Sequence, residues 1–95
     1  MKLRYTRKAA RELSDILEYI SLNSPQGGRV VGGRIGEMIE LLSHFPTAGQ
    51  MTSKGRLRRL IVTPYPYLIF YRITEGHIVI HGVRHAARKP SSMPQ

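Results

Sequence analysis

Arginine, histidine and tyrosine side chains in the second half of this sequence are the groups best suited to chemistry. The candidates lie in or just after stretches rich in β-branched and aromatic residues: Arg58, Arg59, Arg72, Arg84, His85, Arg88 and Lys89. Guanidinium groups bind phosphates, aromatic rings stack on bases, and an imidazole can move a proton near neutral pH. Such a set suits cleavage of RNA through its 2′-hydroxyl group, and it equally suits plain binding of a polyanion.

Other catalytic and metal-binding sets are missing. The acidic residues fall almost wholly in the first half of the chain, and Glu75 is the one exception. A pair of carboxylates for acid–base catalysis is therefore not expected beside the arginines. His81 and His85 are four residues apart with no carboxylate nearby in sequence, and the chain has no cysteine. We expect neither a metal site nor a cofactor.

Positive charge is concentrated in the second half of the chain. The formal net charge is +9, and eleven of the fifteen basic residues are arginine. Residues 1–40 contribute a balance of +2, and residues 41–95 contribute +7. This asymmetry predicts a surface for a polyanion or for an acidic protein segment, with a solvated basic surface as the alternative.

Two helices are predicted in the first half of the chain. Residues 2–5 alternate as a short strand, and Thr6 then suits the N-cap of a helix that runs to about Asn23. Glu12 belongs to the side of this helix that we expect to be solvated. Ser24 and Pro25 suit the start of a second helix over residues 25–44, so the two helices should form an antiparallel hairpin.

Glycines line one face of the second helix. Gly28, Gly32 and Gly36 are four residues apart. Each glycine costs about 1 kcal/mol relative to alanine in a helix interior. The spacing predicts a smooth face that another helix approaches closely, whether that helix belongs to this chain or to a partner.

Three strands are predicted after a turn-rich loop over residues 44–55. They cover residues 57–63, 67–73 and 77–83, and the last two are joined by a turn at residues 74–76. Strict alternation would place Val83 on the same face as His81 and opposite Ile80. The order β-α-α-β-β-β predicts an α+β fold, with the helical hairpin packed on a small antiparallel sheet. We expect one domain over residues 1–90, with residues 91–95 as a loose tail.

No apolar run approaches the length of a membrane span, and the N-terminus lacks the apolar region of a signal peptide. We therefore expect a cytoplasmic protein with no membrane partner.

The ordered motifs resemble a known family. The stretches "LEYI", "NSP", "FPTAG", "LRRLIV", "YPYLIFYRI" and "VRHAAR" follow one another as in the RelE/ParE superfamily of toxins from bacterial type II toxin–antitoxin modules. The resemblance covers about residues 3–90. It implies a small basic toxin that a cognate acidic antitoxin neutralises in a hetero-oligomer, with the helical hairpin and the basic sheet as covered surfaces.

The superfamily divides by target. The resemblance implies either inhibition of DNA gyrase, as in ParE-like members, or cleavage of messenger RNA on the ribosome, as in RelE-like members. In the best-known ribonuclease branch an arginine follows the tyrosine that opens the middle strand, whereas Leu68 follows Tyr67 here. That branch also has a tyrosine after the last strand, and this chain has none beyond Tyr71.

These departures favour the ParE-like branch. A metal-independent endoribonuclease with His85 and Arg84 as its catalytic groups is the alternative, and a non-toxic nucleic-acid-binding module is a second alternative. In each case the residues expected to bind the target are Arg58, Arg59, Arg72, Arg84, Arg88 and Lys89. Of the C-terminal cluster, we expect Arg84, His85, Arg88 and Lys89 to lie just past the last strand, where side chains meet solvent.

Overall fold

The computed structural model describes residues 1–87 and has the predicted α+β class and order of elements. The chain forms, in order, β1 (Lys2–Tyr5), α1 (Arg7–Asn23), α2 (Pro25–His44), β2 (Gln50–Met51), β3 (Arg58–Ile61), β4 (Tyr67–Thr74) and β5 (His77–His85). β2, which lies inside the expected loop, was not predicted, and β5 continues beyond its predicted end at residue 83. No helix in this part of the chain is both long enough and apolar enough to cross a membrane.

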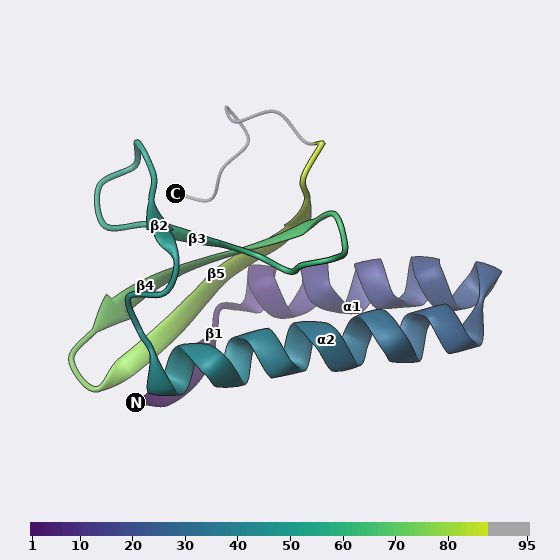
Figure 1. The fold of residues 1–95 in the computed structure, drawn as a ribbon, viewed down its shortest axis with the longest axis horizontal. Coiled ribbons are helices and arrows are strands. Elements are labelled where there is room, and N and C mark those ends of the chain that lie inside the picture. The colour runs from purple at the N-terminus through teal and green to yellow at the C-terminus, as the bar shows by residue number, and fades with distance from the viewer. Residues whose placement is uncertain (88–95) are drawn as a thin grey trace.

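The helix boundaries follow the predicted caps. The Thr6 side chain accepts a hydrogen bond from the Ala9 amide at 3.0 Å, at the start of α1. At the start of α2 the Ser24 side chain accepts a hydrogen bond from the Gly27 amide at 2.9 Å, and Pro25 occupies the first turn. Each cap satisfies an amide that has no partner inside its helix. The short join produces the antiparallel helical hairpin seen in Figure 1.

The sheet is mixed rather than purely antiparallel. Its strand order is β1-β5-β4-β3-β2, and the pairs β5–β4, β4–β3 and β3–β2 are antiparallel as expected. β1 instead runs parallel to β5, with Lys2 opposite His77. A four-residue alternating strand carries no information about its direction, which is decided here by the helical crossover between β1 and the rest of the sheet.

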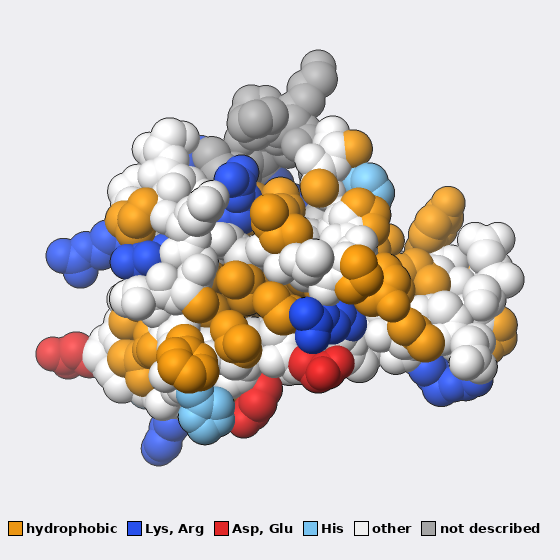
Figure 2. Space-filling model, viewed as in Figure 1, with side chains coloured by type: hydrophobic (Ala, Val, Ile, Leu, Met, Phe, Trp, Pro, Cys, Tyr) orange, Lys and Arg blue, Asp and Glu red, His pale blue; other side chains and the backbone are white. Residues whose placement is uncertain are grey.

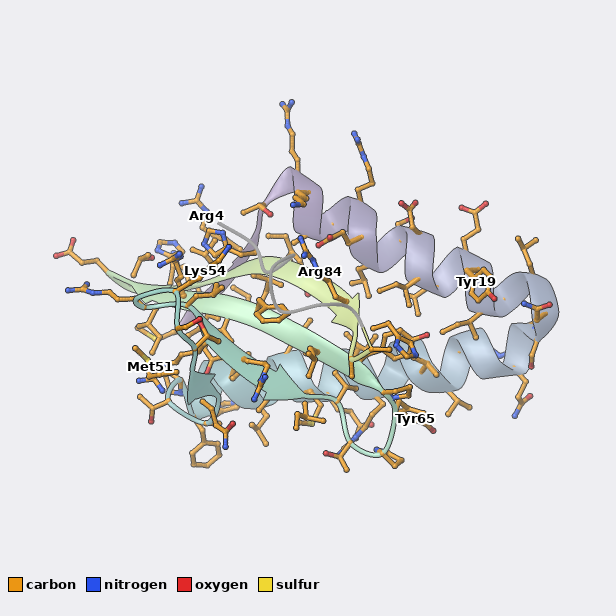
Figure 3. The ribbon with its side chains drawn as sticks, turned by 90° about the horizontal axis from the view of Figure 1, so that it is seen from above. Arg4, Tyr19, Met51, Lys54, Tyr65 and Arg84 are labelled. Atoms are coloured by element: carbon orange, nitrogen blue, oxygen red, sulfur yellow. The ribbon has the colours of Figure 1, made fainter. Side chains whose placement is uncertain are left out.

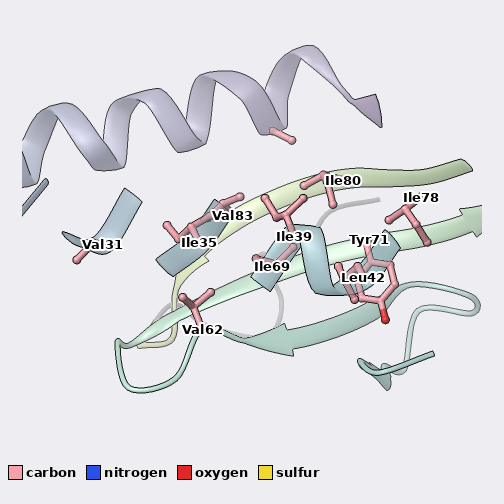
Figure 4. Close-up of a cluster of buried hydrophobic side chains, with 11 residues drawn as sticks. Val31, Ile35, Ile39, Leu42, Val62, Ile69, Tyr71, Ile78, Ile80 and Val83 are labelled. Carbon is pink, nitrogen blue, oxygen red and sulfur yellow. The ribbon is translucent and has the colours of Figure 1, made fainter. Parts of the chain in front are cut away.

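The hydrophobic core lies between α2 and one face of the sheet (Figure 4). Val31, Ile35, Ile39 and Leu42 recur along α2 at helical spacing and are all buried. They pack with Val62, which follows β3, and with buried side chains of the sheet, namely Ile69, Tyr71, Ile78, Ile80 and Val83. We call the opposite side of the sheet the outer face.

An irregularity in β5 changes which side chains reach the core. Phe70 pairs with Gly82 but Tyr71 pairs with Ile80, so His81 has no partner in β4. The extra residue turns Val83 to the same side as Ile80, where it is 1% exposed. Strict alternation was therefore wrong beyond His81.

The two helices diverge along their seam. A Cβ atom on Gly28 would collide with the Ser21 hydroxyl group, and one on Gly32 would lie 3.3 Å from Cδ2 of Leu17. One on Gly36 would meet nothing within 4 Å. The predicted close approach is thus made by α1 at Gly28 and Gly32, and Gly36 takes no part in it.

The difference in space around Gly28 and Gly36 predicts opposite effects for alanine at these two positions. Gly36→Ala should raise the free energy of unfolding by up to about 1 kcal/mol, because it improves helix propensity in open space. Gly28→Ala should lower it, because the Ser21 hydroxyl group must rotate away and Cα of Ser21 would lie only 3.3 Å from the new methyl group. Urea unfolding of both variants measures the two changes. Equal effects at the two positions would contradict the divergence of the helices.

Candidate functional site

The outer face of the sheet is rich in cations. Residues paired across neighbouring strands point to the same side of a sheet. The register therefore places Arg4 and Arg72 on the outer face through Val79, and Arg59 through its partner Phe70. All six carboxylates of the chain lie elsewhere, in α1, in α2 or at Glu75 of the β4–β5 turn. Figure 3 looks onto this face, with Arg4 and Arg84 labelled.

Arg58 lies apart from the other predicted binding residues. It pairs with Tyr71 and so points to the helix-covered side of the sheet. Its Nη1 donates to the carbonyl oxygen of Gly49 at 2.8 Å. Arg58 thus holds the loop after α2, whereas Arg59 reaches Gln50 Oε1 at 3.3 Å on the outer face.

Arg84 is buried, which contradicts its expected position in solvent beyond the last strand. It is 5% exposed, and its Nε lies 3.2 Å from Glu12 Oε2. Oε1 of the same carboxylate accepts a hydrogen bond from the Val83 amide at 3.3 Å. The prediction that Glu12 is solvated was therefore wrong as well.

The reason for this burial is the short length of β1. Its pairing with β5 ends at Ile80, so the next part of the β5 edge has no strand beside it. α1 lies along that edge instead, and Glu12 supplies the acceptor that a longer β1 would have provided. Nη1 of Arg84 is buried and makes no hydrogen bond within the described residues.

The structure separates His85 from Arg84. His85 pairs with Tyr67, so its side chain leaves the sheet on the side opposite Arg84, which pairs with Leu68. Its ring meets that of Tyr67 edge-on, with centroids 5.4 Å apart. Nδ1 accepts a hydrogen bond from the Ala87 amide at 3.0 Å, which occupies the lone pair of that nitrogen. Arg88 and Lys89 lie outside the described residues.

Two residues of the outer face were missed from the sequence. Arg4 could be placed only once β1 was known to pair with β5, and His81 only once the irregularity in β5 was known. Burial lowers the pKa of His81 below its ordinary value, and the nearby Arg72 guanidinium lowers it further. His81 is therefore held in its neutral form near pH 7 beside a fixed positive charge.

The helical side of the molecule exposes apolar side chains among its charged residues. A hollow of about 410 Å³ is lined by Tyr5, Ala10, Leu13, Ser14 and Leu17. Leu41 and Phe45 of α2 are also exposed, at 37% and 64%. Figure 2 shows hydrophobic side chains gathered on the face that carries α2. Within residues 1–87 no group of three or more potential ligands could hold a metal ion.

Comparisons with known proteins agree on one family. The family model described as the ParE toxin of type II toxin–antitoxin system, parDE, matches residues 3–90. A putative toxin, Y4kP, of Sinorhizobium fredii is 33% identical over 85 residues, covering 90% of this chain and 88% of that protein. Toxin RelE2 of Caulobacter vibrioides is 33% identical over 84 residues, covering 88% and 93%.

The fold is also similar to that of a solved structure. The chromosomal ParDE toxin–antitoxin system from P. aeruginosa contains a chain that superimposes with a TM-score of 0.77. The two sequences are 26% identical, and the match covers 90% of this chain and 95% of the other.

The buried ion pair predicts a large effect of removing one partner. Arg84→Ala should lower the free energy of unfolding by about 3 kcal/mol, because the Glu12 carboxylate loses its guanidinium partner in a desolvated site. Glu12→Gln combined with Arg84→Met removes both charges and should cost less than Arg84→Ala alone. Urea unfolding of the single and double variants measures this. Glu37→Gln, at the exposed Arg34–Glu37 pair, is the control and should cost less than about 1 kcal/mol. Wild-type stability in Arg84→Ala would contradict the pair.

The lowered pKa of His81 predicts acid sensitivity. An unfolded histidine titrates at its ordinary value of 6.5, whereas the folded chain takes up this proton only at lower pH. The neutral His81 ring therefore contributes its full stabilisation above the unfolded pKa of 6.5. This contribution is lost as the pH falls from 6.5 through the lower pKa of the folded state. Thermal unfolding between about pH 7.5 and 5 should show a steeper loss in the wild type than in His81→Gln. An unchanged slope in His81→Gln would disprove this assignment.

Proposed function

This chain belongs to the ParE toxin family of type II toxin–antitoxin systems, within the RelE/ParE superfamily, and we propose that it arrests bacterial growth by inhibiting DNA gyrase. The match to the ParE family model over residues 3–90 is the observation that carries this proposal. Arg59 and Arg72, which share the outer face, contact the target in this proposal. Arg88 and Lys89 extend the contact in this proposal. Arg84, which is buried against Glu12, supports the end of β5, and Arg58 supports the loop after α2.

The geometry around His85 supports gyrase inhibition over cleavage of messenger RNA. A general base needs a free lone pair within reach of the substrate. Nδ1 of His85 is engaged by the Ala87 amide, and the side chain of Arg84 lies on the other side of the sheet. Leu68 occupies the position after Tyr67 where the ribonuclease branch carries an arginine. The endonuclease alternative therefore lacks an assembled pair of catalytic groups among residues 1–87.

Membership in this family implies a cognate antitoxin as the partner of the chain. The antitoxin is acidic in this proposal, because a partner that neutralises a chain of net charge +9 gains from opposite charge. Its apolar side chains cover the helical side, where Leu41, Phe45 and the hollow beside Leu13 are exposed. The complex is a toxin–antitoxin hetero-oligomer. Residues 1–90 act as one toxin domain, and residues 91–95 form a tail outside it.

The choice of target is tested by the order in which syntheses stop. After induction of the toxin without its antitoxin, pulse labelling should show DNA synthesis failing while protein synthesis continues at first. Purified toxin should inhibit supercoiling by gyrase, and Arg59→Gln with Arg72→Gln should weaken that inhibition by about 10-fold or more, because two charge contacts are lost. His85→Gln should remain toxic.

The controls separate the target from general toxicity. Coexpression of the neighbouring antitoxin gene should restore growth and yield a complex that co-purifies. Early arrest of translation, with cleaved messages on ribosomes and a loss of toxicity in His85→Gln, would establish the endonuclease alternative instead.

A further inference from the structure

One corner of the outer face brings together cations from neighbouring strands. Arg4 on β1 and Arg72 on β4 flank Val79 on β5. Neighbouring strands lie about 4.8 Å apart, so the Cα atoms of the two arginines are separated by about 10 Å. His81 lies on the intervening strand, close enough to Arg72 for their charges to interact.

No carboxylate within residues 1–87 forms an ion pair with the arginines of this corner, Arg4 and Arg72. Glu12, the carboxylate held against β5, is engaged by Arg84 and by the Val83 amide. Lys2 and His77, paired on the next row, extend the basic surface toward the edge of the sheet. The corner thus attracts an anion from outside the chain.

We propose that Arg4, Arg72 and His81 bind the phosphodiester backbone of DNA. The toxin would thereby contact the DNA held by its target as well as the target protein. This proposal deepens the proposed function, because the DNA is the substrate of the proposed target. The binding step itself needs no gyrase, so it can be measured with the toxin alone.

The chemistry of the outer face favours a nucleic acid over an acidic protein. Arginine presents a planar fork of donors that matches phosphate oxygens. Protein interfaces have an apolar centre, whereas Ile61 is the one exposed large hydrophobic residue that the strand register places on this face within residues 1–87. The exposed apolar surface of α2 and the hollow beside Leu13 lie on the helical side. The molecule therefore offers separate surfaces for a protein and for a polyanion.

His81 adds a donor whose charge responds to the ligand. Without an anion the ring is neutral near pH 7, because burial and Arg72 both oppose its protonation. A phosphate placed between Arg4 and Arg72 would offset that repulsion and stabilise the protonated ring. Binding at this corner must therefore raise the pKa of His81.

Fluorescence anisotropy with a short labelled duplex, and with a single strand of equal length, tests the proposal on the purified chain. At salt concentrations from about 50 to 200 mM, Arg4→Gln with Arg72→Gln should bind DNA at least about 10-fold more weakly than the wild type. The slope of log K against log salt concentration should fall in magnitude by about 2. Lys8→Gln with Arg29→Gln removes the same charge from the helices and should keep the wild-type slope. Arg4→Gln alone changes an exposed residue and should lower the slope by about 1.

Three results would overturn the proposal. The first is equal weakening of DNA binding in the two double variants. The second is competition by polyglutamate that displaces the labelled DNA as well as unlabelled DNA does, because the site would then be a surface for acidic protein. The third comes from an NMR titration of the His81 ring, if added oligonucleotide leaves its pKa unchanged. If the toxin binds DNA through these residues but does not inhibit gyrase, the DNA site stands and the proposed target is wrong. If the toxin inhibits gyrase but binds no DNA, the proposed target stands and the DNA site is wrong.

Discussion

The buried phenol of Tyr71 is the constraint on which the arrangement of helices and sheet depends. Its hydroxyl donates to the carbonyl oxygen of Pro46 at 2.8 Å and accepts from the Gly49 amide at 2.8 Å. A side chain on Gly49 would bring a Cβ atom to 2.6 Å from that oxygen, so the position admits only glycine. The chain leaving α2 is thereby fixed to the middle of β4. This attachment sets where β2 begins and how α2 lies across the sheet.

Charge is distributed by element in a way that gives the molecule two different sides. The carboxylates lie on the helices, apart from Glu75, and the outer face of the sheet carries arginines without acids. Apolar side chains that remain exposed gather on the helical side. The same fold therefore offers one surface whose exposed side chains suit apolar contacts and another whose arginines suit an anion. Glu12 is the exception that joins the two sides, through Arg84.

Local signals allowed the helices to be predicted closely and the faces of the sheet only in part. Thr6, Ser24 and Pro25 act within one turn of their own positions, so their effect can be read without tertiary structure. The burial of Arg84 depends on Glu12, which lies near the other end of the chain and meets β5 only because β1 is short. The position of Val83 depends on the irregular pairing of β4 with β5, which no residue in the sequence indicates. Family resemblance identified the class of protein, whereas the roles of individual arginines required the register of the strands.

The parallel pairing of β1 with β5 joins the first strand of the chain to the last. Lys2 lies beside His77, and the Thr6 amide donates to the carbonyl oxygen of Ile80. Neither the edge of β5 nor the salt bridge to Glu12 can form before this C-terminal strand has left the ribosome. The helical hairpin, which needs only local contacts, is complete much earlier in synthesis. The nascent chain therefore presents its apolar helices before it possesses the cationic corner on the sheet, so a partner protein that binds the hairpin can do so before the sheet is complete.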